Sequence, residues 1–148
     1  MDLGLLYTTD RLPAPEVREF ARQAETCGIE SLWLPEVTGR DPFALAGDLF
    51  AHTGRLHIAT GIANVYARDP AAMHAGSATL AEASGGRFML GLGVSNPGIN
   101  KVRGNSVWEA PLPKMRSYLD SIDNLSMSVP DVAYPRFIAA HGPGLLGV

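Results

Sequence analysis

The feature that most constrains this chain is a regular alternation of short apolar runs with segments of helical periodicity. The runs that read as strands are residues 2–7, 31–36, 55–62, 87–94 and 135–143, and the helical segments are 13–28, 41–54, 67–86 and 111–125. This order predicts an α/β fold with a parallel sheet and right-handed crossovers. Strands that are apolar on both faces fit either an open doubly wound sheet or part of a closed (β/α)8 barrel.

The predicted helix ends carry capping signals. Asp41 and Asp69 each precede a proline, the arrangement expected of an N-cap followed by proline at the first helical position. Gly28 is placed to end the first helix, and the pair Gly85–Gly86 is placed to end the third. Local chemistry therefore supports the same boundaries as the apolar pattern.

The fourth predicted strand contains Gly91 and Gly93, two residues apart and so on one face. Missing side chains there indicate either a closely packed neighbouring element or a flat ligand, and strand geometry favours packing. The spacing is not a dinucleotide fingerprint, because no third glycine opens a helix and the segment follows the fourth strand rather than the first.

Composition excludes several classes of protein. The chain has 148 residues, 46% of them hydrophobic and 18% charged, and a net charge of −3, which indicates a globular protein without an electrostatic footprint for nucleic acid or anionic lipid. It shows no signal-peptide pattern and no run of membrane-spanning length, so we expect a cytoplasmic protein.

The single cysteine, Cys27, falls in an apolar-periodic segment and is predicted to be a buried thiol. His52, His57 and His74 lack ligand spacing, so no metal site is expected.

Three stretches together resemble the luciferase-like monooxygenase superfamily of flavin- or deazaflavin-dependent oxidoreductases. They are LWLPEVTGRDPF (32–43), LHIATGIANVYARDPAAM (56–73) and above all SGGRFMLGLGVSN (84–96). The resemblance implies a (β/α)8 barrel with its site at the carboxyl ends of the strands. It also implies flavin mononucleotide (FMN) or the deazaflavin coenzyme F-420 as cofactor, and a small organic substrate.

The same resemblance suggests site residues. A bulge after the third strand, often with a non-prolyl cis peptide, supports the cofactor ring in the family; here it falls on Gly61–Ile62. Glu36 and Asn96 occupy the positions of polar groups near the reacting centre, although an amide cannot act as general acid or base. The residues implied to bind the cofactor are Tyr7, Gly61, Ile62, Ala63, Asn64, Tyr66, Gly93 and Ser95.

Each assignment has a structural alternative. Glu36 could be a solvated loop acid, and Asn64 and Tyr66 could satisfy loop backbone groups. Arg68 beside Asp69 could form a surface ion pair. His141 lies at the predicted end of the fifth strand, where barrel sites form, but a lone histidine in a turn is more often structural.

Length bears on the architecture and on function. A complete barrel needs about 250 residues, so the expectation is one luciferase-like domain over 1–148, truncated to an incomplete barrel of about five strands. Such a sheet would leave free edges and an apolar inner face, which predicts a homodimer or larger assembly. Two functions follow: an oxidoreductase that transfers hydride or activates oxygen, or a catalytically silent half-barrel that self-associates.

Overall fold

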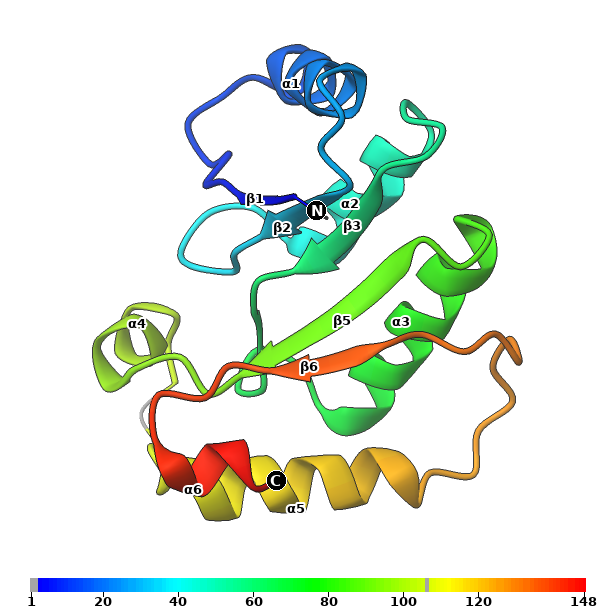
Figure 1. Ribbon diagram of the computed structural model, residues 1–148. Helices are drawn as coiled ribbons and strands as arrows, with labels where there is room; N and C mark the ends of the chain where they lie inside the picture. Colours follow the sequence, from blue (N-terminus) through cyan, green and yellow to red (C-terminus); the bar gives the residue numbers. More distant parts are fainter. Residues whose placement is uncertain (1–2, 106) are drawn as a thin grey trace.

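The computed structural model describes residues 3–105 and 107–148, which form one curved sheet with helices on its convex side (Figure 1). The strands are β1 (Gly4–Leu6), β2 (Ser31–Leu34), β3 (His57–Thr60), β4 (Ala63–Asn64), β5 (Phe88–Gly93) and β6 (Arg136–Ile138). The helices are α1 (Ala14–Thr26), α2 (Pro42–Phe50), α3 (Pro70–Ala83), α4 (Pro97–Val102), α5 (Pro111–Asp123) and α6 (Pro143–Leu146). The predicted alternation is confirmed, and the short strand β4 lies just after the predicted third strand (55–62), in residues expected to form a loop.

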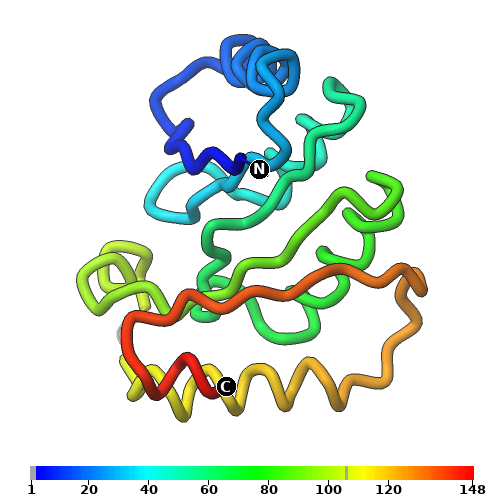
Figure 2. The backbone as a smooth tube through the Cα atoms, in the orientation of Figure 1, coloured from blue at the N-terminus to red at the C-terminus, as the bar shows by residue number. Residues whose placement is uncertain are grey.

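Every strand pair in the sheet is parallel. The order is β1–β2–β3–β5, with β4 and β6 both paired to β5. Leu90, Gly91 and Leu92 of β5 align with Arg136, Phe137 and Ile138 of β6, so segments far apart in the sequence run side by side (Figure 2). The fold is thus an open part of a (β/α) barrel, as predicted.

The core lies between the sheet and the helices. Leu32, Ile58 and Phe88 occupy matching positions on β2, β3 and β5, and all three are fully buried. Val17 of α1 and Met73 of α3 cover the same side and are equally inaccessible. Apolar burial of this kind is the main stabilising term, about 1.5–3 kcal/mol for each large side chain.

The capping predictions are confirmed. The Asp41 carboxylate accepts from the backbone N–H groups of Phe43 and Ala44, and Asp69 accepts from Ala72. Gly28 has a φ of +82°, and the glycine pair after α3 also has positive φ values, which explains why helices end there. The short helices α4 and α6 were not predicted from the sequence.

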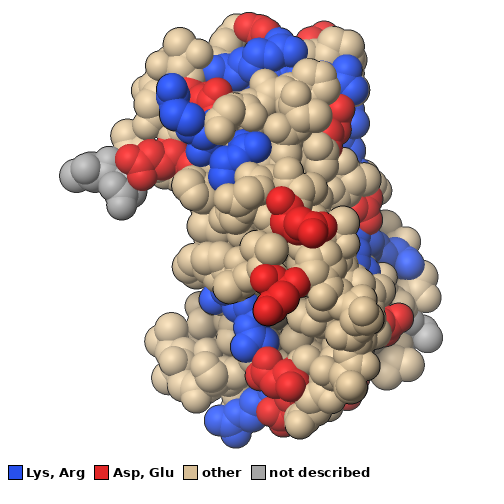
Figure 3. Space-filling view, turned by 90° about the vertical axis from the view of Figure 1, so that its right-hand side faces the viewer, with Lys and Arg blue, Asp and Glu red and all other residues tan. Residues whose placement is uncertain are grey.

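One prediction about the surface is wrong. Cys27 is exposed, because it lies just past the last turn of α1, where the apolar periodicity of the helix no longer faces the sheet. On the face shown in Figure 3, acidic and basic side chains are interspersed, with uncharged surface between them. None of the helices in the described ranges is both long and apolar enough to cross a membrane.

Candidate functional site

A mainly apolar pocket of about 470 Å³ lies on the concave face of the sheet, toward the carboxyl ends of the strands. It is lined by Leu6, Trp33, Gly61, Ile62, Gly91, Phe137, Ile138, Ala139 and His141. A second cavity of about 560 Å³ lies among α3, α5 and the segment before β6, on the opposite side of the sheet. In parallel α/β folds ligands bind at the carboxyl ends of strands, so the concave pocket is the candidate site.

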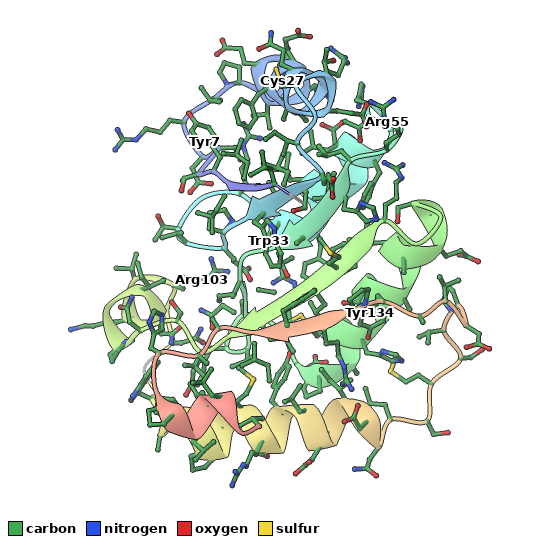
Figure 4. The ribbon with its side chains drawn as sticks, viewed as in Figure 1. Tyr7, Cys27, Trp33, Arg55, Arg103 and Tyr134 are labelled. Atoms are coloured by element: carbon green, nitrogen blue, oxygen red, sulfur yellow. The ribbon has the colours of Figure 1, made fainter. Side chains whose placement is uncertain are left out.

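Two aromatic rings shape this pocket. Trp33 projects from β2 onto the concave side, where Phe137 of β6 meets it edge to face with ring centroids 5.4 Å apart (Figure 4). The indole N–H of Trp33 donates to the hydroxyl of Ser31 at 3.0 Å, which fixes the ring orientation. Neither aromatic residue was identified from the sequence, although both fall within predicted strands.

The floor of the pocket is the segment between β3 and β4. The hydroxyl of Thr60 donates to the carbonyl of Gly91 at 2.8 Å and accepts from the N–H of Gly91 at 2.9 Å. The Thr60 side chain thus links β3 to β5 beyond the residues whose backbones pair. The Gly61–Ile62 peptide bond that follows is cis, as the family resemblance predicts.

The glycines of β5 are explained by close packing. A Cβ atom at Gly91 would lie 2.1 Å from the carbonyl oxygen of Thr60, and one at Gly93 would lie 2.6 Å from Cγ1 of Ile62. Both positions are filled by the segment that forms the pocket floor. Packing, rather than direct contact with a flat ligand, therefore accounts for both missing side chains.

Glu36 follows β2 and is the centre of a buried ion network. Its side chain is 1% exposed and accepts from Nη1 of Arg68 at 2.7 Å and from Nη2 of Arg103 at 2.9 Å. It also accepts from the backbone N–H of Asn64 at 2.9 Å, and its own N–H donates to the carbonyl of Ile62 at 3.2 Å. The carboxylate thus ties together three loops at one edge of the sheet and does not line the pocket.

Two groups around this network, Asp41 and Arg68, have shifted pKa values. Burial acts to raise the pKa of Asp41, but hydrogen bonds from the N–H of Ala44 and the charge of Arg68 outweigh it, so this pKa is lowered. Burial acts to lower the pKa of the Arg68 guanidinium, whereas its bonds to Glu36 raise it, and the net direction is upward. Arg68 therefore pairs with Glu36 and Asp41 rather than with the neighbouring Asp69.

The parallel pairing places Tyr7, Glu36, Asn64, Ser95 and Asn96 at the same edge of the sheet, as predicted. Their side chains nevertheless point in different directions. The Tyr7 ring stacks on Phe20 of α1 with centroids 4.7 Å apart and therefore faces a helix, not the pocket.

The two asparagines serve the local backbone. Asn64 is fully buried; its Oδ1 accepts from the N–H of Tyr66, and its Nδ2 donates to Asn100 at 2.6 Å. Oδ1 of Asn96 accepts from the N–H of Ile99 and caps α4.

The remaining predicted residues lie at or just after the carboxyl ends of β4 and β5. Ala63 is buried and pairs with Leu92, and Tyr66 stacks on Trp108 with centroids 5.6 Å apart. Ser95 has a φ of 59°, a conformation uncommon outside glycine that turns the chain from β5 toward α4. Of the predicted site residues, Gly61 and Ile62 line the pocket itself. Among the residues that the structure describes, no group of three histidine, cysteine or acidic side chains could hold a metal ion.

Comparison with known proteins identifies the family. The family model described as luciferase-like monooxygenase matches residues 1–142. The chain belongs to the luciferase-like monooxygenase family. A Mycobacterium tuberculosis protein named as a coenzyme F420-dependent oxidoreductase is 31% identical over 123 residues, 82% of this chain and 35% of that protein. The 5,10-methylenetetrahydromethanopterin reductase of Methanolobus tindarius is 30% identical over 111 residues, 74% of this chain and 34% of the relative.

Several solved structures share the fold. The coenzyme F420-dependent tetrahydromethanopterin reductase from Methanopyrus kandleri has a TM-score of 0.79 at 20% identity, over 98% of this chain and 52% of that chain. The oxygenating constituent of 3,6-diketocamphane monooxygenase from Pseudomonas putida, in complex with FMN, has a TM-score of 0.72 at 18% identity, over 91% and 45% of the two chains. The chain thus spans about half the length of these structures and about a third of the relatives above.

Proposed function

We propose that this chain acts as a flavin- or deazaflavin-dependent oxidoreductase that transfers hydride to or from a small organic substrate, or activates oxygen against it, in the cytoplasm. The observation that carries the proposal is the apolar pocket at the carboxyl ends of the strands, in a chain of the luciferase-like family. One relative is named for F420, and one solved neighbour contains FMN, so both cofactors are candidates.

The pocket suits the ring system of such a cofactor. Its volume of about 470 Å³ lies in the range of small-molecule sites, roughly 300–1,000 Å³. A Cβ atom at Gly61 would lie 3.0 Å from Cβ of Trp33 and 3.5 Å from Cδ1 of Leu6, two residues that line the pocket, so glycine keeps this space open. The described lining residues include no lysine or arginine, so phosphate groups of the cofactor would bind elsewhere.

A bound flavin or deazaflavin supplies the capacity to accept or donate a hydride, and the chain supplies binding and orientation. In this proposal Gly61 and Ile62 contact the ring directly. The other residues that the resemblance assigns to cofactor binding are Tyr7, Ala63, Asn64, Tyr66, Gly93 and Ser95, which end or follow strands at the same edge of the sheet. Glu36 and Asn96 then act by holding loops in place, Glu36 through Arg68 and Arg103 and Asn96 through the cap of α4.

Titration of the protein with FMN and with F420, followed by fluorescence, tests the proposal. We expect one of the two to bind. Gly61→Val should weaken that binding at least about tenfold, because its side chain enters the pocket. Gly54→Val is the matched control, since a Cβ there meets nothing within 4 Å. Absence of binding by the wild-type protein would contradict the proposed function.

The alternative of a catalytically silent, self-associating half-barrel is favoured by the exposed concave face. Leu6 of β1 and Phe137 of β6 are 62% and 43% exposed, and each belongs to a strand paired on one side among the described residues. Unpaired strand edges beside apolar surface favour association, and a two-fold dimer could cover both. Light scattering behind a sizing column tests this. A dimer that binds neither cofactor would support the alternative.

A further inference from the structure

The two outer strands of the sheet, β1 and β6, each have a free backbone edge (Figure 1). The N–H of Tyr7 donates to a carbonyl of β2 at 3.3 Å, so the N–H and C=O of the preceding Leu6 face away from β2. The N–H of Ala139 donates to a carbonyl of β5 at 2.9 Å, so those of Ile138 face away from β5. Such groups are ready to pair with another strand.

The directions of these strands allow two copies to use every free edge. Because each strand pair in the sheet is parallel, β1 and β6 run the same way. A two-fold axis along the strands places β6 of one copy beside β1 of the other, and the same pairing repeats on the opposite side. The assembly then closes at two copies. Pairing of β1 with β1 would instead leave both β6 edges free.

The surface area also fits an association of this size. The chain has an accessible surface of 7912 Å², whereas a folded monomer of 15.7 kDa has about 7,300 Å². The excess of roughly 600 Å² approaches the 800 Å² or so that each partner contributes to an interface of standard size. The chain also spans 52% of the Methanopyrus kandleri reductase, so two copies contain about as much of this fold as that neighbour.

The chemistry of the concave face suits a second copy better than a charged partner. Among the described residues that line its pocket, none is lysine, arginine, aspartate or glutamate. Leu6 and Phe137 provide half-exposed apolar surface beside the two free edges. Two such faces can meet without burying an unpaired charge, which would be costly. A partner recognised by charge would find no counterpart there.

We propose that two copies of this chain associate edge to edge through β1 and β6, and that the concave pocket becomes an enclosed cofactor site only in this dimer. The second part rests on the proposed function. Small-molecule sites bury 70–90% or more of their ligand, roughly speaking, whereas the pocket of one copy is open where Leu6 and Phe137 are exposed. In the dimer, Phe137 of one copy lies beside the partner's Leu6, and the two pockets face each other.

Hydrogen exchange tests the mode of association without any substitution. Light scattering, with reducing agent because Cys27 is exposed, should give twice 15.7 kDa at micromolar concentration. Peptides that cover β1 and β6 should exchange at least about tenfold more slowly above the dimer dissociation constant than below it. The peptide that covers β3 is the control, because β3 is paired on both sides within one copy. A monomer, or a dimer whose β1 and β6 exchange as in the monomer, would overturn the proposal.

A proline at the free edge tests whether the site depends on the dimer. The N–H of Arg136, two residues before Ile138, also faces away from β5, and Arg136 does not line the concave pocket. Arg136→Pro removes this N–H, whereas Arg136→Ala removes the same side chain and keeps it. The proline variant should dimerise at least about tenfold more weakly, because both symmetric pairings lose a hydrogen bond.

Cofactor titration of the same two variants completes the test. As a monomer with native circular dichroism, Arg136→Pro should bind FMN or F420 at least about tenfold more weakly than wild type, because one face of the ring stays in water. Arg136→Ala should stay within about threefold of wild type. Wild-type affinity in monomeric Arg136→Pro would overturn the shared site. A wild-type dimer with slowed exchange that binds neither cofactor would instead contradict the proposed function and leave the association supported.

Discussion

Replacing Glu36 by glutamine removes one charge from the ion network and leaves the shape of the side chain nearly unchanged. The carboxylate is 1% exposed and faces Arg68 and Arg103, whose side chains are 14% and 23% exposed. A glutamine amide retains one acceptor oxygen, but its NH2 group would face guanidinium donors. Both arginines would then lose a charged partner in a poorly solvated place.

The expected cost follows from this geometry. Removing one partner of a buried ion pair destabilises by about 3–5 kcal/mol, because the other charge stays buried without compensation. Arg68 keeps its contact with Asp41, and Arg103 keeps its bond to the carbonyl of Val37 at 2.8 Å, so the low end of that range applies. We therefore expect Glu36→Gln to lower the free energy of unfolding by about 3 kcal/mol, or Tm by roughly 6–12 °C in a chain of this size.

Urea denaturation followed by circular dichroism, at one fixed protein concentration, measures the effect. Glu82→Gln is the control, because Glu82 is exposed on α3, and its change should stay within about 0.5 kcal/mol. The double variant Glu36→Gln, Arg103→Gln should lose less than the sum of the single variants, since removing both partners restores charge balance. A loss below about 1 kcal/mol for Glu36→Gln would refute the view that this carboxylate holds the three loops together.

Two further predictions concern packing and pH. Gly91→Ala should destabilise by at least about 1–3 kcal/mol, because its Cβ would lie 2.1 Å from the Thr60 carbonyl oxygen, whereas Gly54→Ala should be nearly neutral; thermal melts of both variants decide this. Asp41 has a pKa lowered in the folded state, so its contribution is present above the unfolded value of about 3.9 and is lost as pH falls through the folded value. Asp41→Asn keeps a side chain that can cap the helix. The substitution should therefore lower the free energy of unfolding by only about 0.5 kcal/mol at pH 7 and by less at pH 3, as measured by urea titration. An equal loss at both pH values would contradict a lowered pKa of Asp41 in the folded state.

The sequence alone determined the features that depend on neighbouring residues. Apolar runs alternating with helical periodicity were enough to predict the parallel sheet, and Asp41 and Asp69 marked helix starts because a cap bonds to an N–H two or three residues away. Gly28 marked a helix end for the equally local reason that its φ is positive. The family resemblance located the Gly61–Ile62 bulge. Each of these features depends on interactions between residues that are close together in the sequence.

Tertiary structure decided which side chains meet. Nothing in the local sequence pairs Glu36 with Arg103, because their contact depends on where α4 lies after β5, and α4 itself is a six-residue helix too short to show a periodicity. Gly91 and Gly93 are required because Thr60 and Ile62, at the end of β3 and just after it, pack against β5 at these two positions. His141 reaches that pocket because β6 pairs with β5, and pairing between distant strands is set by burial of the shared core rather than by any motif near the histidine.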